Sequence, residues 1–170
     1  MNIILETPRL LLGEFTEADA PLIFMLNADP EVVKYIHEPV LEDEAAALDV
    51  IRNIILPQYL LKLGRWAVFI KATHQFIGWC GLKYRPELDE IDLGYRLIKS
   101  AWGQGFATEA AKACLNYGLN TLQLNKIIGR AHVDNTASIQ VLEKIGMQFL
   151  KSEEIDDCPV KTYLIAAKSL

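Results

Sequence analysis

The sequence predicts a mixed α/β (α+β) fold, in which a mostly antiparallel central sheet carries helices on both faces. Apolar and polar residues alternate along residues 90–97, which is the period of a half-buried strand. Apolar residues recur at spacings of three and four along residues 43–55, which is the period of an amphipathic helix. Strand-like and helix-like segments follow one another in a mixed order, which favours helices packed on a sheet.

The first half of the chain is expected to begin with a leucine-rich strand over residues 9–15. Thr16 then caps a helix that an Asp-Pro pair ends, and a short helical piece over residues 31–35 follows. Asp43 opens a further helix, which Pro57 should kink or end because proline has no backbone N–H.

The second half begins with a hairpin of two strands within residues 66–84, followed by the strand 90–97. A glycine-rich turn then leads into an alanine-rich helix over residues 106–119. A short helix follows, with Asn135 as its N-cap and Gly146 as its C-cap. The other strands are expected at residues 124–133, 147–151 and 162–167.

Composition narrows the classes of protein. The chain has 170 residues, of which 51% are hydrophobic, and it contains no repeat or Gly/Ser linker, so one domain over residues 1–170 is expected. The net charge of −5, without a Lys/Arg cluster, argues against nucleic-acid binding. No apolar run suits a membrane span, and the first residues lack a signal pattern, so a cytoplasmic protein is expected. The cysteines and histidines are scattered, which predicts reduced thiols and no bound metal.

The turn from Trp102 to Thr108 is the first candidate for chemistry. The first N–H groups of a helix have no partner within it, and the helix dipole adds positive charge there. Gly103 and Gly105 would let the backbone approach a phosphate closely. No P-loop lysine follows, and the third glycine of a dinucleotide fingerprint is absent. Taken alone, the pattern fits an anion site and a tight turn equally well.

The segments around this turn carry a family resemblance. Residues 93–97, Leu-Gly-Tyr-Arg-Leu, and residues 102–110, Trp-Gly-Gln-Gly-Phe-Ala-Thr-Glu-Ala, together resemble motif A of the GNAT acetyltransferases. Residues 135–147 downstream, and residues 6–10 with 29–32 upstream, resemble the branch that contains the ribosomal-protein N-terminal acetyltransferases. The resemblance covers nearly the whole chain in the expected order, although the family consensus often has Gln or Arg in place of Trp102.

The resemblance implies that acetyl-CoA binds between splayed strands, with its pyrophosphate on the backbone amides of the turn. The thioester carbonyl would lie near the N–H of Leu97, and Asn135 would hydrogen-bond the pantetheine or neighbouring atoms. A tyrosine that serves many family members as proton donor is replaced here by Leu142, so Ser138 and water are the candidate acids. The amides implied for the pyrophosphate belong to Gly103, Gln104, Gly105, Phe106, Ala107 and Thr108.

Two carboxylates are candidates for the base. Acetyl transfer needs a neutral amine, and Glu90 and Asp92 lie on one face of the predicted strand, near the expected position of that amine. Either could take the proton, directly or through water, and both could equally be a solvated polar face.

The predicted reaction is transfer of acetyl from acetyl-CoA to a primary amine, by direct attack in a ternary complex. A protein N-terminus is one acceptor, and a small amine such as a polyamine, amino sugar or amino-acid derivative is another. A catalytically silent acyl-CoA-binding module is the third interpretation. Residues 36–62 are expected to form part of the acceptor site, and the chain is expected to be a monomer or a homodimer.

Overall fold

The computed structural model describes residues 1–36, 38 and 40–167. Residues 37 and 39, which belong to the predicted acceptor segment, lie outside the described residues, and so does the histidine at position 37. Within the described part, no helix has the length and apolarity needed to cross a membrane.

Eight strands form one sheet in the order β1-β2-β3-β4-β5-β6-β8-β7. Only the β5–β6 pair is parallel; the other neighbours are antiparallel, which confirms the predicted mixed sheet. The strands are β1 (Ile3–Glu6), β2 (Leu10–Glu14), β3 (Gly64–Ile70), β4 (Gln75–Arg85), β5 (Glu90–Leu97), β6 (Lys126–His132), β7 (Gln148–Ile155) and β8 (Cys158–Ala166).

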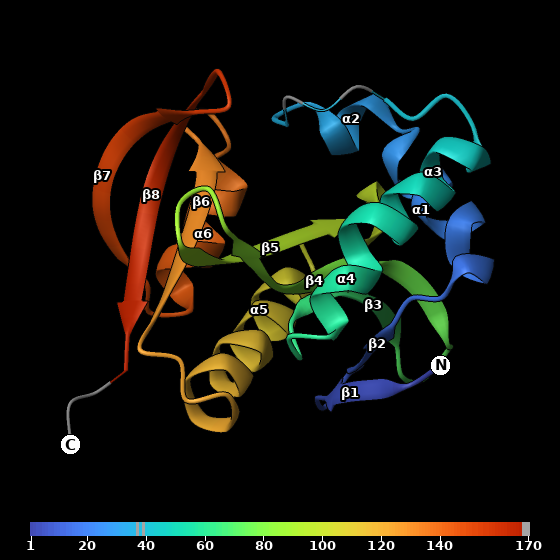
Figure 1. The fold of residues 1–170 in the computed structure, drawn as a ribbon, viewed down its shortest axis with the longest axis horizontal. Coiled ribbons are helices and arrows are strands. Elements are labelled where there is room, and N and C mark those ends of the chain that lie inside the picture. Colours follow the sequence, from blue (N-terminus) through green and yellow to red (C-terminus); the bar gives the residue numbers. More distant parts are fainter. Residues whose placement is uncertain (37, 39, 168–170) are drawn as a thin grey trace.

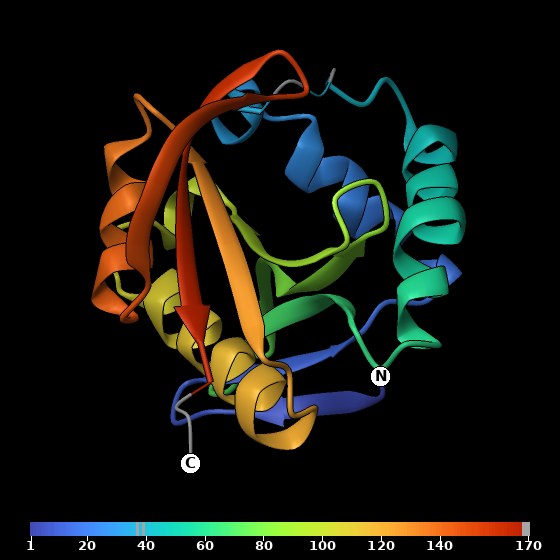
Figure 2. The same ribbon diagram turned by 60° about the vertical axis from the view of Figure 1, so that its left-hand side comes forward.

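Helices cover both faces of this sheet (Figure 1). Figure 2 shows α3 and α4 on the opposite side of the sheet from α5 and α6. The helices are α1 (Ala20–Asn27), α2 (Pro30–Val33), α3 (Glu44–Val50), α4 (Leu56–Tyr59), α5 (Phe106–Asn116) and α6 (Thr136–Lys144).

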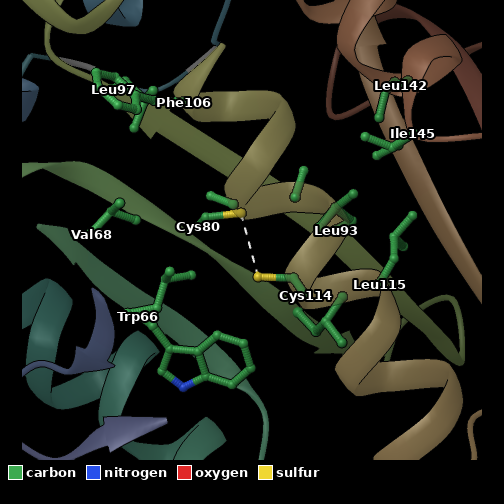
Figure 3. Close-up of a cluster of buried hydrophobic side chains, with 14 of the residues drawn as sticks. Trp66, Val68, Cys80, Leu93, Leu97, Phe106, Cys114, Leu115, Leu142 and Ile145 are labelled. Carbon is green, nitrogen blue, oxygen red and sulfur yellow. Dashed lines mark hydrogen bonds between the residues drawn. The ribbon is translucent and has the colours of Figure 1, made fainter. Parts of the chain in front are cut away.

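The larger core lies between α5 and the middle strands (Figure 3). Cys114 and Leu115 of α5 are buried in the same cluster as Trp66 of β3 and Cys80 of β4. The sulfurs of Cys80 and Cys114 lie 3.5 Å apart as free thiols, and burial raises the pKa of Cys114. Cys114 is therefore a protonated core residue rather than a nucleophile.

A second core lies on the other face of the sheet. Ile23 of α1 and Ala47 of α3 pack there with Ala67 of β3 and Trp79 of β4. Thr16 is the N-cap of the short 3-10 turn that leads into α1, and the carboxylate of Asp19 accepts a hydrogen bond from its N–H at 2.7 Å. The packing of this core brings α1 close to β5, where Asn27 of α1 bonds to Arg96.

Two details differ from the predictions. β1 was not expected, because a four-residue edge strand shows no usable alternation. Pro57 was expected to kink or end the helix opened by Asp43, and this helix loses its regular α-helical form in a π-helical turn, Ile51–Ile55, directly before α4. β7 and β8 are longer than predicted because the charged turn residues Asp156 and Asp157 both adopt positive φ, which suits a tight hairpin.

Candidate active site

β5 and β6 separate partway along their length. They pair only at Asp92 with Ile128 and at Leu93 with Gly129. Beyond these positions β5 stays paired with β4, up to Leu97, while β6 stays paired with β8. Figure 1 shows the two strands running in different directions from this point. The second half of β5 therefore has one free edge, which faces an opening between the strands.

Two backbone donors point into this opening. The N–H of Ile98 donates to the Ile77 carbonyl of the β4 segment at 2.9 Å. Because N–H groups alternate in direction along an antiparallel strand, those of Tyr95 and Leu97 point away from β4. Neither has a hydrogen-bond partner among the described residues. The amides of Leu97 and Tyr95 thus both lie on the free edge of β5.

The glycine turn follows the end of β5. Gly103 and Gly105 have φ of 72° and 78°, a region that strongly favours glycine. The first bond of α5 is made by the N–H of Glu109, which donates to the Gly105 carbonyl at 3.0 Å. Over the described chain, the N–H groups of Phe106, Ala107 and Thr108 in the first turn of α5 have no protein partner, which is the arrangement that binds an anion at a helix N-terminus.

Arg9 stands beside this turn and was missed by the sequence reasoning. The Glu109 carboxylate accepts hydrogen bonds from the Thr7 hydroxyl at 2.6 Å and from the N–H and Nε of Arg9 at 2.9 and 2.6 Å. Arg9 Nη1 also donates to the Gln104 carbonyl at 2.9 Å. Burial favours a raised pKa for Glu109, but the bonds from Thr7 and Arg9 outweigh it and hold the pKa low. A contact spanning 100 residues leaves no local signal in the sequence.

Two hydroxyl groups meet at the other side of the opening. Asn135 caps α6 by accepting a hydrogen bond from the Ser138 N–H at 3.1 Å. The Ser138 Oγ lies 2.9 Å from the Tyr95 hydroxyl, and burial raises the pKa of Tyr95 above its usual range. Leu142 is buried in the core. Tyr95 was missed because strand alternation placed it among the apolar residues of β5.

A cavity of about 280 Å³ lies along this part of β5. Asp92 and Ser138 line it, whereas Glu90 does not. Burial raises the pKa of Asp92 to about 6, against the opposing charge of Arg130. The Glu90 carboxylate instead accepts a hydrogen bond from Arg130 Nη2 at 2.6 Å. Of the two predicted bases, Asp92 is therefore the one beside the cavity.

A family model described as an acetyltransferase (GNAT) domain matches residues 9–148. The chain belongs to the GNAT acetyltransferase family. It is 33% identical over 145 residues to the uncharacterized N-acetyltransferase p20 of Bacillus licheniformis, a match that covers 85% of this chain and 82% of the relative.

Solved structures agree with this assignment. A GNAT-family acetyltransferase from Bacillus anthracis superposes with a TM-score of 0.77 at 27% identity, over 98% of both chains. RimL, a ribosomal L7/L12 α-N-protein acetyltransferase solved with coenzyme A, superposes with a TM-score of 0.83 at 18% identity, also over 98% of both chains. At that identity, the likeness to RimL concerns the fold.

Few residues of the segment that was predicted to contact the acceptor line the cavity. Of the described residues between 36 and 62, Ile36 and Glu38 line it. Trp79 lines it as well, while Trp66 is buried in the core and Trp102 donates from Nε1 to the Leu97 carbonyl at 2.8 Å. That last bond ties the glycine turn of this GNAT fold to the end of β5.

Proposed function

We propose that this GNAT protein transfers the acetyl group of acetyl-CoA to a primary amine by direct attack in a ternary complex. The proposal is carried by two features on either side of the second half of β5. The first turn of α5, which follows β5, presents unpaired N–H groups, and the cavity beside β5 contains the partly buried carboxyl of Asp92. An anion-binding turn and a titratable carboxyl on one strand edge suit a phosphate-containing acyl donor and an amine.

The turn would hold the pyrophosphate of acetyl-CoA through these amides, with the guanidinium of Arg9 adding positive charge beside it. Asn135 and the free edge of β5 would contact the pantetheine arm. Acetyl-CoA supplies an activated acetyl group. The protein has to position this group, remove a proton from the amine and supply one to the departing thiolate.

Asp92 would take the proton from the attacking amine, because a carboxyl with a pKa of about 6 is largely ionised at neutral pH yet still basic. Tyr95 is three residues further along the strand, about 10 Å between α-carbons, so we propose a water molecule between carboxylate and amine. The N–H of Tyr95 or Leu97 would stabilise the oxyanion. As the C–N bond forms and the C–S bond breaks, the departing thiolate would take a proton from the Ser138–Tyr95 hydroxyl pair or from water.

A protein N-terminal amine is the first acceptor to consider, since RimL, whose name describes that activity, shares this fold. A small-molecule amine is the second, because the cavity is of a size that suits a compact acceptor. A silent acyl-CoA-binding module would retain the turn but show no transfer.

The test is release of free CoA thiol from acetyl-CoA in the presence of N-terminal peptides and small amines. We expect acetyl-CoA to raise the unfolding midpoint and at least one amine to release CoA with formation of its acetamide. Stabilisation without release from any amine would leave only the silent module. The absence of any effect of acetyl-CoA on unfolding would contradict cofactor binding itself.

A further inference from the structure

Among the side chains that line the cavity, cations outnumber carboxylates. Five cationic side chains line it against three carboxylates, those of Glu38, Asp92 and Asp156. The cationic side chains are those of Arg65, Lys83, Arg85, Arg96 and Arg130. The chain as a whole carries a net charge of −5, so this local excess runs against the balance of the molecule.

Two of these cations form no ion pair within the described residues. Arg85 pairs with Glu87 and Asp156, and Arg130 pairs with Glu90. Arg65 and Lys83, which are partly exposed, have no side-chain bond to a carboxylate in that part of the chain, although the charges of Glu38 and Asp92 act on them. Burial lowers the pKa of Arg65 to about 10, with the charge of Arg96 acting in the same direction. Burial also lowers the pKa of Lys83, and Arg65 and Arg85 add to the effect.

Arg65 and Arg96 lie over the same indole ring. Their guanidinium carbons are 4.5 and 5.5 Å from the centre of the Trp79 ring. Arg96 is only 7% exposed, and it bonds to Asn27 and to Glu38, the latter at 3.1 Å. Its Nε is a buried donor without a partner. Of the two guanidinium groups on this ring, only that of Arg96 forms an ion pair with Glu38 among the described residues, so the charge of Arg65 is the less compensated.

The cationic groups and Asp92 share one face of the sheet. In the strand register Arg65 pairs with Gly81, Gly81 with Gly94, and Lys83 with Asp92, so these residues point to the same side. Gly94 lies two residues from Asp92 and two from Arg96, about 7 Å along the strand in each direction. A Cβ at Gly94 would lie 3.1 Å from the Trp79 ring. The absence of a side chain at this position therefore leaves space in the cavity next to the ring.

We propose that the acceptor of this enzyme is a primary amine that also carries an anionic group, a carboxylate or a phosphate, a few bonds from the nitrogen. Arg65 and Lys83 bind the anion, while the amine faces Asp92. The inference rests on the proposed function and narrows its acceptor. It disfavours polyamines, because the charges of Arg65 and Lys83 would repel a polycation.

The experiment compares acceptors in matched pairs that differ only in the anion. The pairs are alanine with alaninamide, phosphoethanolamine with ethanolamine, and the peptide amide Asp-Ala-Ala with Asn-Ala-Ala, with spermidine as a polycation. We expect kcat/KM to favour the anionic member of at least one pair by about tenfold or more. The pair that responds identifies the source of the anion. Equal or better rates with all the neutral members, or with spermidine, would overturn the proposal.

Variants test the assignment to these residues. Arg65→Gln and Lys83→Met should each reduce the preference in kcat/KM for the anionic over the neutral acceptor by about tenfold or more. Arg65→Lys should restore part of the loss. Arg52→Gln is the control, since Arg52 is exposed and pairs with Glu17 away from the cavity. Loss of activity towards both members of a pair would point to a structural role and contradict the assignment.

A binding measurement separates this inference from the proposed function. Each pair, in its N-acetylated form, is titrated calorimetrically into protein saturated with CoA, so that cofactor phosphates cannot account for binding. We expect at least one acetylated anion to bind, its neutral partner to bind weakly, and Arg65→Gln to lose the difference. If no amine is turned over, the proposed function fails. The calorimetric comparison still tests whether the cavity binds an anion. Equal binding of both members, or none by either, would overturn the inference.

Discussion

Asp92 is the residue on which the proposed proton transfer depends. Its Oδ1 is buried without a hydrogen-bond partner, and the nearest guanidinium nitrogen of Arg130 is 3.9 Å away. Arg130 also forms ion pairs with Glu90 and Glu153, so its charge offsets only part of the effect of burial on the pKa of Asp92. This sharing leaves Asp92 with a pKa of about 6, above the ordinary 3.8. Ionising Asp92 therefore opposes folding as pH rises through 6, which is typical of a functional carboxyl.

The wild-type value of kcat/KM is expected to rise with pH through about 6, because Asp92 has to be ionised to accept a proton. Asp92→Asn should remove this rise of kcat/KM with pH and lower kcat by about 100-fold or more. Glu90→Gln should keep the rise but move it to lower pH, since the charge of Glu90 helps to raise the pKa of Asp92. The measurement is a pH–rate profile of the three proteins. A wild-type profile in Asp92→Asn would leave solvent as the base.

The sequence placed Glu90 and Asp92 on one strand face but did not distinguish them. The distinction comes from Arg130, which is 40 residues from Glu90 in the chain and reaches it only because β5 and β6 pair in parallel. Tyr95 was hidden in the same way, since its hydroxyl is polar but its position in the alternation is apolar. Its role depends on the packing of α6, which brings Ser138 within 2.9 Å.

At the scale of the elements, local patterns predicted most of the fold. The clean alternation of residues 90–97 gave β5 its bounds, and Asp43 and Asn135 cap α3 and α6 as expected from their side chains. The prediction failed where a long-range partner stabilises an element, as for β1, which pairs with β2 at the sheet edge. It also failed where charged residues form a tight turn between long strands, as between β7 and β8.

The turn before α5 can be tested against a second glycine in the same backbone conformation. Gly105 and Gly146 both have positive φ, 78° and 91°, and a Cβ at either would meet no backbone atom within 4 Å. Gly105→Asp and Gly146→Asp should thus each lose about 1–2 kcal/mol of stability from the left-handed conformation. Only Gly105→Asp should abolish acetyl-CoA binding, because its carboxylate would face the pyrophosphate. Calorimetry measures both affinities, and an unchanged affinity of Gly105→Asp would contradict the assigned turn.

At the scale of the molecule, the sheet has two parts that share little pairing. β1 to β5 form one part, β6, β8 and β7 form the other, and two residue pairs of β5 and β6 connect them. The family resemblance predicted that two strands splay apart. The point of separation, after Leu93, could not be read from the sequence because it depends on the register between two strands that are distant in the chain. A cofactor in this opening would contact both parts.

Hydrogen exchange of backbone amides with and without acetyl-CoA tests this account most directly. The unpaired amides of Tyr95 and Leu97 lie on the free edge of β5, and those of residues 106–108 lie in the first turn of α5. We expect acetyl-CoA to slow exchange in both segments together, because one molecule would span them. Exchange in the distant β1–β2 hairpin should change little, except in the turn that contains Arg9. Protection confined to other segments, or no protection at saturating acetyl-CoA, would contradict the placement of the donor between β5 and β6.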